Sequence, residues 1–220
     1  MRIGLISYHP PYPGAEASNW LNPTLLGQYA RALVQQGHQV QWVSSPNTVA
    51  AYAADVPLVA DQADSLPETC RYVVPCRLYR LHEARLYCID RAVWQERPLH
   101  TRLFTFLYLL QRELPCQVLH AWGAFPAAYL AVYVARLIGV PAVVSYDTQS
   151  LNDGPQQAFE WQWVARHVSR ALVASGADGE RLAATSDVAR TRIQVVPTEM
   201  SAAVATLTEL YASLHRAETL

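Results

Sequence analysis

Residues 117–147 read QVLHAWGAFPAAYLAVYVARLIGVPAVVSYD, and this stretch decides the fold class. The apolar runs at 117–122 and 142–147 predict two buried strands, and residues 125–138 have the apolar spacing of a helix. Gly139 follows that helix, where glycine commonly ends one. Two buried strands joined by a helix predict a parallel β-α-β unit.

The same alternation extends along the chain in both directions. Further strands are predicted over residues 2–8, 39–45, 170–175 and 192–197. Helices are predicted over residues 23–37, 98–114, 155–169, 178–184 and 201–217. Residues 71–82 leave room for one or two more strands. This order predicts an α/β fold, a Rossmann-like doubly wound parallel sheet of six or seven strands, with its site at the carboxyl ends of the strands.

Composition and motifs exclude several classes of function. Hydrophobic residues make up 51% and charged residues 16% of the 220 residues, which is typical of a protein with a sizeable core. A formal net charge of −1 and the absence of a recognised motif argue against nucleic-acid binding. All 17 basic residues are arginine, so no lysine nucleophile or P-loop is present. Neither a GxGxxG nor a GxSxG motif occurs.

The cysteines and the apolar stretches indicate a cytoplasmic protein. Cys70, Cys76, Cys88 and Cys116 form no CxxC pair, so reduced thiols are expected, with no metal site and no cofactor. No basic segment followed by an apolar one occurs near residue 1, so no signal peptide is expected. The most apolar stretch, 127–144, is interrupted by charged and turn-forming residues, so no transmembrane span is expected.

Four passages together resemble the N-terminal half of a GT-B glycosyltransferase of family 4. They are residues 1–14 (MRIGLISYHPPYPG), 32–44 (ALVQQGHQVQWVS), 117–147, and 163–184 followed by RIQVVP at 192–197. Their order and spacing carry the resemblance. It implies a single GT-B half domain that binds a sugar acceptor, either a carbohydrate or a lipid-linked molecule. In the family a second domain binds the nucleotide-sugar donor.

The C-terminal part departs from the family pattern. After Pro197, where the family enters its donor domain, one predicted helix follows, with an apolar stripe formed by Val204, Leu207, Leu210, Tyr211 and Leu214. The resemblance implies that this helix packs back on the N-terminal domain. We therefore expect one domain over residues 1–200, with a helix over 201–217 packed on it. The donor domain is then expected on a separate protein chain, and this chain alone is expected to be inactive.

Three strand ends carry the candidate site residues that the resemblance implies. The loop after the first strand offers His9, Gly14 and Glu16, although Ala15 stands where the family often has a second glycine. A remnant phosphate or acceptor loop and an ordinary proline-rich connection are both compatible with it. We predict that Gly14 lies along one edge of the sheet with His120, Trp122 and Asp147, at the carboxyl ends of the strands.

The second and third strand ends offer the remaining candidates. His120 and Trp122 are two residues apart in one predicted strand. Because successive side chains point to opposite faces of a strand, these two lie on the same face. His120 either binds an acceptor or is a hydrogen-bonded core residue, and Trp122 either stacks on a sugar or packs. At the third strand end lie Tyr146, Asp147 and Thr148. Asp147, where many family members have histidine, is the candidate general base; acceptor binding and loop capping are its alternative roles.

The segment 71–102 combines seven arginines and three acidic residues with interleaved aromatic residues. The resemblance implies that it borders the acceptor cleft and offers a peripheral membrane contact; a solvated face of mixed charge is the alternative.

Three hypotheses remain for the function of the whole chain. The first is the acceptor-side half of a glycosyltransferase. A non-catalytic scaffold, regulatory or carbohydrate-binding protein of the same fold is another, favoured by Ala15, Trp122 and Asp147. An excised domain is the third.

Overall fold

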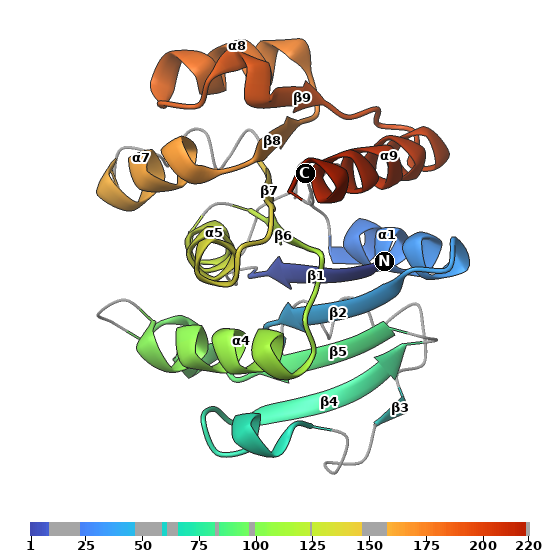
Figure 1. Cartoon of the computed structure of the whole chain (residues 1–220), viewed down its shortest axis with the longest axis vertical. Helices are drawn as coiled ribbons and strands as arrows, with labels where there is room; N and C mark the ends of the chain where they lie inside the picture. The colour runs from blue at the N-terminus through green and yellow to red at the C-terminus, as the bar shows by residue number, and fades with distance from the viewer. Residues whose placement is uncertain are drawn as a thin grey trace.

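A nine-stranded sheet forms the centre of the protein in the computed structural model, which describes residues 1–8, 23–46, 59–60, 66–81, 84–96, 100–123, 125–146 and 158–218. The strands are β1 (Arg2–Ser7), β2 (Gln39–Ser44), β3 (Val59–Ala60), β4 (Cys76–Leu81), β5 (Ala84–Ile89), β6 (Val118–Trp122), β7 (Ala142–Ser145), β8 (Arg170–Val173) and β9 (Ile193–Val195). They are ordered β3-β4-β5-β2-β1-β6-β7-β8-β9 (Figure 1).

The strands from β5 to β9 in this order pair in parallel, which confirms the Rossmann-like α/β class. The whole sheet is larger than the predicted six or seven strands, because β4 pairs antiparallel with β5, and β3 with β4. The sequence pattern does not predict β5. Both β4 and β5 have arginines among their apolar residues. Neither strand therefore has the continuous apolar sequence that predicts a buried strand.

Helices cover both faces of the sheet. Within the described residues they are α1 (Pro23–Gln35), α3 (Arg91–Trp94), α4 (Thr101–Glu113), α5 (Ala127–Ile138), α7 (Ala158–His167), α8 (Gly176–Thr185) and α9 (Met200–Glu218), together with the 3-10 turns η2 (Glu68–Cys70) and η4 (Arg190–Arg192). Figure 1 shows α4, α5 and α7 on one side and α1 and α9 together on the other. Two apolar clusters correspond to these two layers.

Local signals explain most helix ends. Gly37 and Gly139 have φ angles of 82° and 72° directly after α1 and α5, as expected of glycines that end helices. α8 begins at Gly176, earlier than the predicted residue 178, because the Ser175 hydroxyl caps it by accepting a hydrogen bond from the Asp178 amide (3.1 Å). α4 begins at Thr101, preceded by His100 in a left-handed conformation.

The predicted apolar stripe of the C-terminal helix is buried. All five of its residues belong to the cluster that also contains Leu26, Tyr29 and Leu33 of α1. α9 therefore packs on the same sheet whose last strand precedes it, beside α1 (Figure 1). The division at residue 200 stays a prediction, and the helix itself runs from Met200 to Glu218.

The aromatic residues of segment 71–102 are divided between core and surface. Tyr87 and Trp94 are fully buried, whereas Tyr72 is 91% exposed. The segment therefore does not present its interleaved aromatic residues on one common face, and a membrane contact through it stays a prediction. Within the described ranges, no helix has the length and apolar character needed to cross a membrane.

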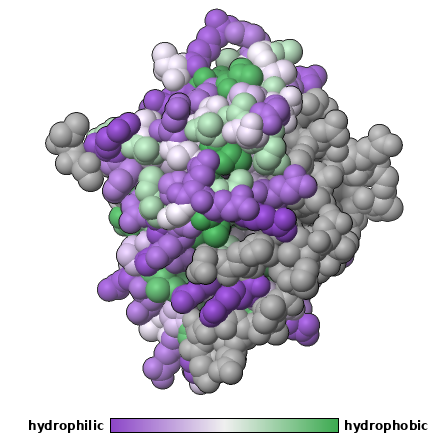
Figure 2. Space-filling model, turned by 90° about the vertical axis from the view of Figure 1, so that its right-hand side faces the viewer, coloured by the Kyte–Doolittle hydropathy of each residue, from purple (hydrophilic) through white to green (hydrophobic). Residues whose placement is uncertain are grey.

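The described surface is mostly polar, and the cysteines are free thiols. Figure 2 shows the side of the molecule that lies to the right in Figure 1, where hydrophilic residues predominate among the coloured atoms and hydrophobic ones are scattered. Cys70, Cys88 and Cys116 are buried and Cys76 is half-buried, all as free thiols. Burial raises the pKa of the Cys116 thiol to about 12, so it stays protonated at neutral pH.

Candidate active site

The carboxyl ends of β1, β6 and β7 lie next to one another in the sheet. The strand register pairs Ser7 with Trp122 and Trp122 with Ser145, so these three residues form one row across the strands. The arrowheads of β1 and β2 mark this edge at the left in Figure 1. Ligands of open parallel sheets bind outside such an edge, so the candidate site lies there.

The predicted site residues divide into described and undescribed ones. His9, Gly14, Glu16, Asp147 and Thr148 lie outside the described residues. The structure brings His120 and Trp122 together, with 5.0 Å between ring centroids, on the face covered by α1 and α9. Tyr146 lies on the opposite face, in the cluster with α4, α5 and α7.

His120 is fully buried and both of its ring nitrogens have partners. Nε2 lies 2.8 Å from the Ser145 hydroxyl oxygen, and Nδ1 is hydrogen-bonded to the Tyr211 hydroxyl. Burial lowers the pKa of His120 to about 3, so the imidazole is neutral at pH 7. A neutral imidazole has one donor and one acceptor, which these two hydroxyls match. This is the environment of a hydrogen-bonded core histidine; an acceptor-binding role stays a prediction.

Trp122 is also fully buried. Its ring lies 5.0 Å from the ring of Tyr29 on α1. Burial and, secondarily, the Glu199 carboxylate raise the pKa of Tyr29 to about 12. Neutral aromatic side chains from α1, β6 and α9 therefore meet under α9. In this packing Trp122 has no open face for a sugar, and its proposed stacking on an acceptor stays untested.

Tyr146 is buried against Trp161 of α7, with 5.1 Å between ring centroids and 73° between the ring planes. Burial raises the pKa of its phenol, so Tyr146 stays protonated at neutral pH. Tyr146 therefore suits hydrogen bonding or packing rather than proton abstraction. The candidate for proton abstraction is the next residue, Asp147, which lies outside the described residues.

Two further aromatic pairs at this edge are not apparent in the sequence pattern. Tyr8 stacks on Trp94 with 5.2 Å between centroids and 19° between planes. The ring of His100, a buried residue with a φ angle of 49°, lies 5.1 Å from that of Phe125. The position of Tyr8 directly after a buried strand is a local signal that marks it. Trp94 and His100 have no such signal, because only the fold brings them to the edge.

Relatives of known structure share the fold. UDP-GlcNAc 2-epimerase from Neisseria meningitidis, bound to UDP-GlcNAc, matches with 9% identity and a TM-score of 0.55, covering 99% of this chain and 53% of the epimerase. UDP-GlcNAc 2-epimerase from Methanocaldococcus jannaschii matches with 10% identity and a TM-score of 0.53, covering 89% and 45%. The chain thus spans about half the length of these two enzymes.

The sequence comparisons identify the family. No curated protein sequence matches the chain. The sequence model described as Glycosyltransferase Family 4 matches residues 24–198, which include all of α1 except its first residue and every later element up to β9. This match covers far more than half of the chain and agrees with the Rossmann-like sheet. The chain belongs to glycosyltransferase family 4.

Proposed function

We propose that this chain is the acceptor-side half of a glycosyltransferase that transfers a sugar from a nucleotide-sugar donor, and that a separate chain supplies the donor-binding half. One observation carries the proposal. The family match extends over residues 24–198, while the described residues form a single Rossmann-like sheet with α9 packed back on it. The two epimerases of similar fold are about twice as long, so this chain corresponds to about half of each.

The roles of this half follow from its side chains. Asp147 accepts the proton of the acceptor hydroxyl as that oxygen attacks the sugar. The donor's diphosphate takes up negative charge as it leaves, and this charge needs compensation in the transition state. Because family members bind the donor with their second domain, the partner half provides that compensation.

A non-catalytic carbohydrate-binding or scaffold protein is the second candidate. It is favoured by the complete burial of His120 and Trp122, two of the residues that would otherwise contact an acceptor. Such a protein would bind a glycan, or a partner chain, without transferring a sugar. The two candidates differ in one measurable outcome, which is sugar transfer in the presence of the partner.

The test is reconstitution of transfer. Proteins that copurify with the chain from its source are identified, and a partner with a donor-binding domain is produced separately. Transfer from UDP-GlcNAc and from other UDP- and GDP-sugars is then measured for each chain alone and for the mixture. UDP-GlcNAc is the first donor because the neisserial epimerase of similar fold binds it. Transfer by the mixture only is expected. A stable complex without transfer from any donor would favour the non-catalytic candidate.

A further inference from the structure

Three aromatic pairs line the carboxyl edge of the sheet on the side of α4, α5 and α7. The pairs are Tyr8–Trp94, Phe125–His100 and Trp161–Tyr146, with centroid distances of 5.2, 5.1 and 5.1 Å. In each pair the first ring is half-buried and the second is buried. A buried ring behind each outer ring restricts its motion, so the outer rings of Tyr8, Phe125 and Trp161 are held in place.

The strand register brings these pairs to neighbouring positions. Because Ser7, Trp122 and Ser145 form one row, the residues that follow them, Tyr8, Gly123 and Tyr146, are adjacent at the edge. Neighbouring strands lie about 4.8 Å apart, which places the backbones of Tyr8 and Tyr146 roughly 10 Å apart with Gly123 between them. Tyr8 and Tyr146 both belong to the face covered by α4, α5 and α7.

Gly123 leaves the middle of this row without a side chain. Its φ angle is 90°, and apart from its chain neighbours no described residue has an atom within 4 Å of the position that a Cβ would occupy. Its amide is fixed by a hydrogen bond to the Ser145 carbonyl oxygen (3.1 Å). Among the described residues, the row therefore has aromatic residues at both ends and no side chain in the middle.

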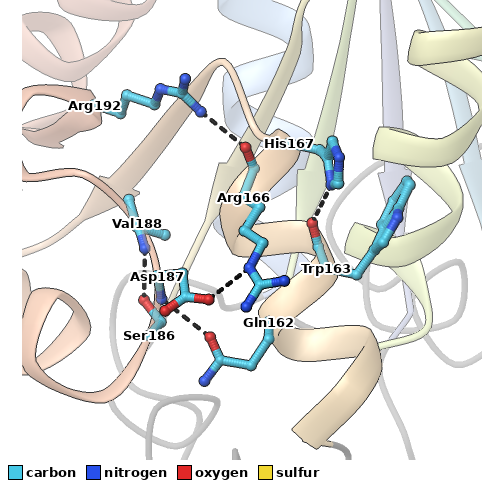
Figure 3. A network of polar contacts seen from close by, with 8 residues as sticks. All are labelled: Gln162, Trp163, Arg166, His167, Ser186, Asp187, Val188 and Arg192. Carbon is cyan, nitrogen blue, oxygen red and sulfur yellow. Dashed lines mark hydrogen bonds and ion pairs between the residues drawn. The ribbon is translucent and has the colours of Figure 1, made fainter.

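The helix that carries Trp161 is anchored independently of this row. Gln162 accepts a hydrogen bond from the Asp187 amide (3.1 Å), and Arg166 pairs with the Asp187 carboxylate (2.6 Å). Arg192 donates to the Arg166 carbonyl oxygen (3.0 Å), as Figure 3 shows. These contacts hold α7 against the segment after α8, so the position of Trp161 does not depend on a ligand.

We propose that Tyr8, Phe125 and Trp161, which flank the side-chain-free position of Gly123, form a subsite that binds an uncharged ring of the acceptor by stacking. The identification of the bound molecule as the sugar acceptor rests on the proposed function. The binding of a ring by these side chains does not depend on it. Aromatic platforms take either an aromatic ring or the apolar face of a sugar ring. The three outer side chains carry no charge, whereas anionic groups are bound by arginine or lysine.

The test measures binding of three probes to the whole chain by saturation-transfer NMR and calorimetry. Phenyl β-glucoside carries both kinds of ring, whereas methyl β-glucoside carries only the sugar and phenol only the aromatic ring. We expect phenyl β-glucoside to bind, and the other two probes to show which ring is stacked. Tyr8→Leu and Trp161→Leu are expected to weaken binding at least tenfold, and Tyr8→Phe and Trp161→Phe less than threefold.

Phe159→Leu is the matched control, because Phe159 lies in the same helix as Trp161 and is 75% exposed. It is expected to leave binding unchanged. Thermal melts identify any variant that fails to fold. If a leucine variant fails, binding by Tyr8→Phe and Trp161→Phe is still compared with that of the parent protein. Binding of none of the three probes overturns the subsite, as does an equal loss in Phe159→Leu or an unchanged affinity in both leucine variants.

The subsite and the proposed function fail in different ways. If the mixture with the partner transfers sugar and the leucine variants keep the acceptor KM, the subsite is wrong and the function stands. If the variants lose ring binding as expected while no donor supports transfer, the subsite stands and the function is wrong.

Discussion

Tyr211 of α9 is hydrogen-bonded to the imidazole of His120 in β6, a residue that lies 91 positions earlier in the chain. Both side chains are fully buried. The contact joins the C-terminal helix to a strand at the centre of the sheet. It makes α9 part of the packed domain, and it occupies one of the two ring nitrogens that would otherwise be available to a ligand.

Removal of this hydroxyl is expected to destabilise the protein. Tyr211→Phe leaves a buried nitrogen of His120 without a partner, which costs about 1–3 kcal/mol in the free energy of unfolding. Urea unfolding at pH 7 measures the loss. Tyr133→Phe, at a residue that is 37% exposed, is the control and is expected to change stability by less than about 0.5 kcal/mol. Equal stability of the two variants would contradict the role given to this contact.

Stability is expected to fall as the pH drops from about 6.5 towards 3. Burial lowers the pKa of His120 to about 3 in the folded state, from 6.5 in a free side chain. Between these values the unfolded chain binds a proton that the folded chain does not, so acid favours unfolding, by at most about 1.4 kcal/mol per pH unit for this group.

The measurement compares urea unfolding of the parent protein and His120→Gln at pH 7, 6, 5 and 4. Carboxylates titrate in both proteins, so only the difference between the two slopes reports on His120. The variant is expected to have the shallower dependence on pH. Parallel slopes over this range would show that His120 is not held neutral by the fold.

Truncation of the C-terminal helix is expected to lower the melting temperature markedly or to make the protein insoluble. Deletion of residues 201–220 exposes the cluster under α9, in which burial of each large apolar side chain contributes about 1.5–3 kcal/mol. The milder change Leu207→Ala is expected to cost about 2–5 kcal/mol. Glu209→Ala, at an exposed position of α9, is the control. An unchanged melting temperature and a monomeric state after truncation would mean that α9 is a tail or a docking element.

Asp147→Asn is expected to reduce transfer by the reconstituted pair by about 10²–10⁴-fold in kcat, because the amide cannot accept the acceptor's proton. The KM for the donor is expected to stay unchanged, since the partner half binds it. Thr148→Ala, at the neighbouring predicted site residue, is expected to raise the acceptor KM with a smaller effect on kcat. Full activity of Asp147→Asn would leave Asp147 with only a binding or structural role.

The chain alone is expected to bind nucleotide sugars weakly. In the proposed arrangement the partner provides most contacts to the nucleotide and the diphosphate, and this chain contributes no lysine. Calorimetry with UDP-GlcNAc and with a GDP-sugar, in the absence of the partner, measures this directly. Micromolar affinity would place the donor site on this half.

The α/β class, most of the helices and the burial of the C-terminal stripe are determined by the sequence itself. Apolar spacing repeats over a few residues, as in 117–147 and in the stripe from Val204 to Leu214, and such a local pattern specifies which face of an element is buried. Helix-ending glycines such as Gly139 act locally as well. The edge of the sheet that carries the candidate site follows from the same alternation.

Only the tertiary structure decided how the side chains at that edge are used. His120 is enclosed because α9 places Tyr211 against it, and Trp94 reaches Tyr8 from 86 positions away. β5 joins the parallel sheet although its arginine interrupts the apolar pattern. These contacts join residues far apart in sequence, and no local pattern encodes such distances. The physical reason is that the burial of a side chain depends on how the sheet and its covering helices assemble. The apolar periodicity of a segment depends only on its own sequence.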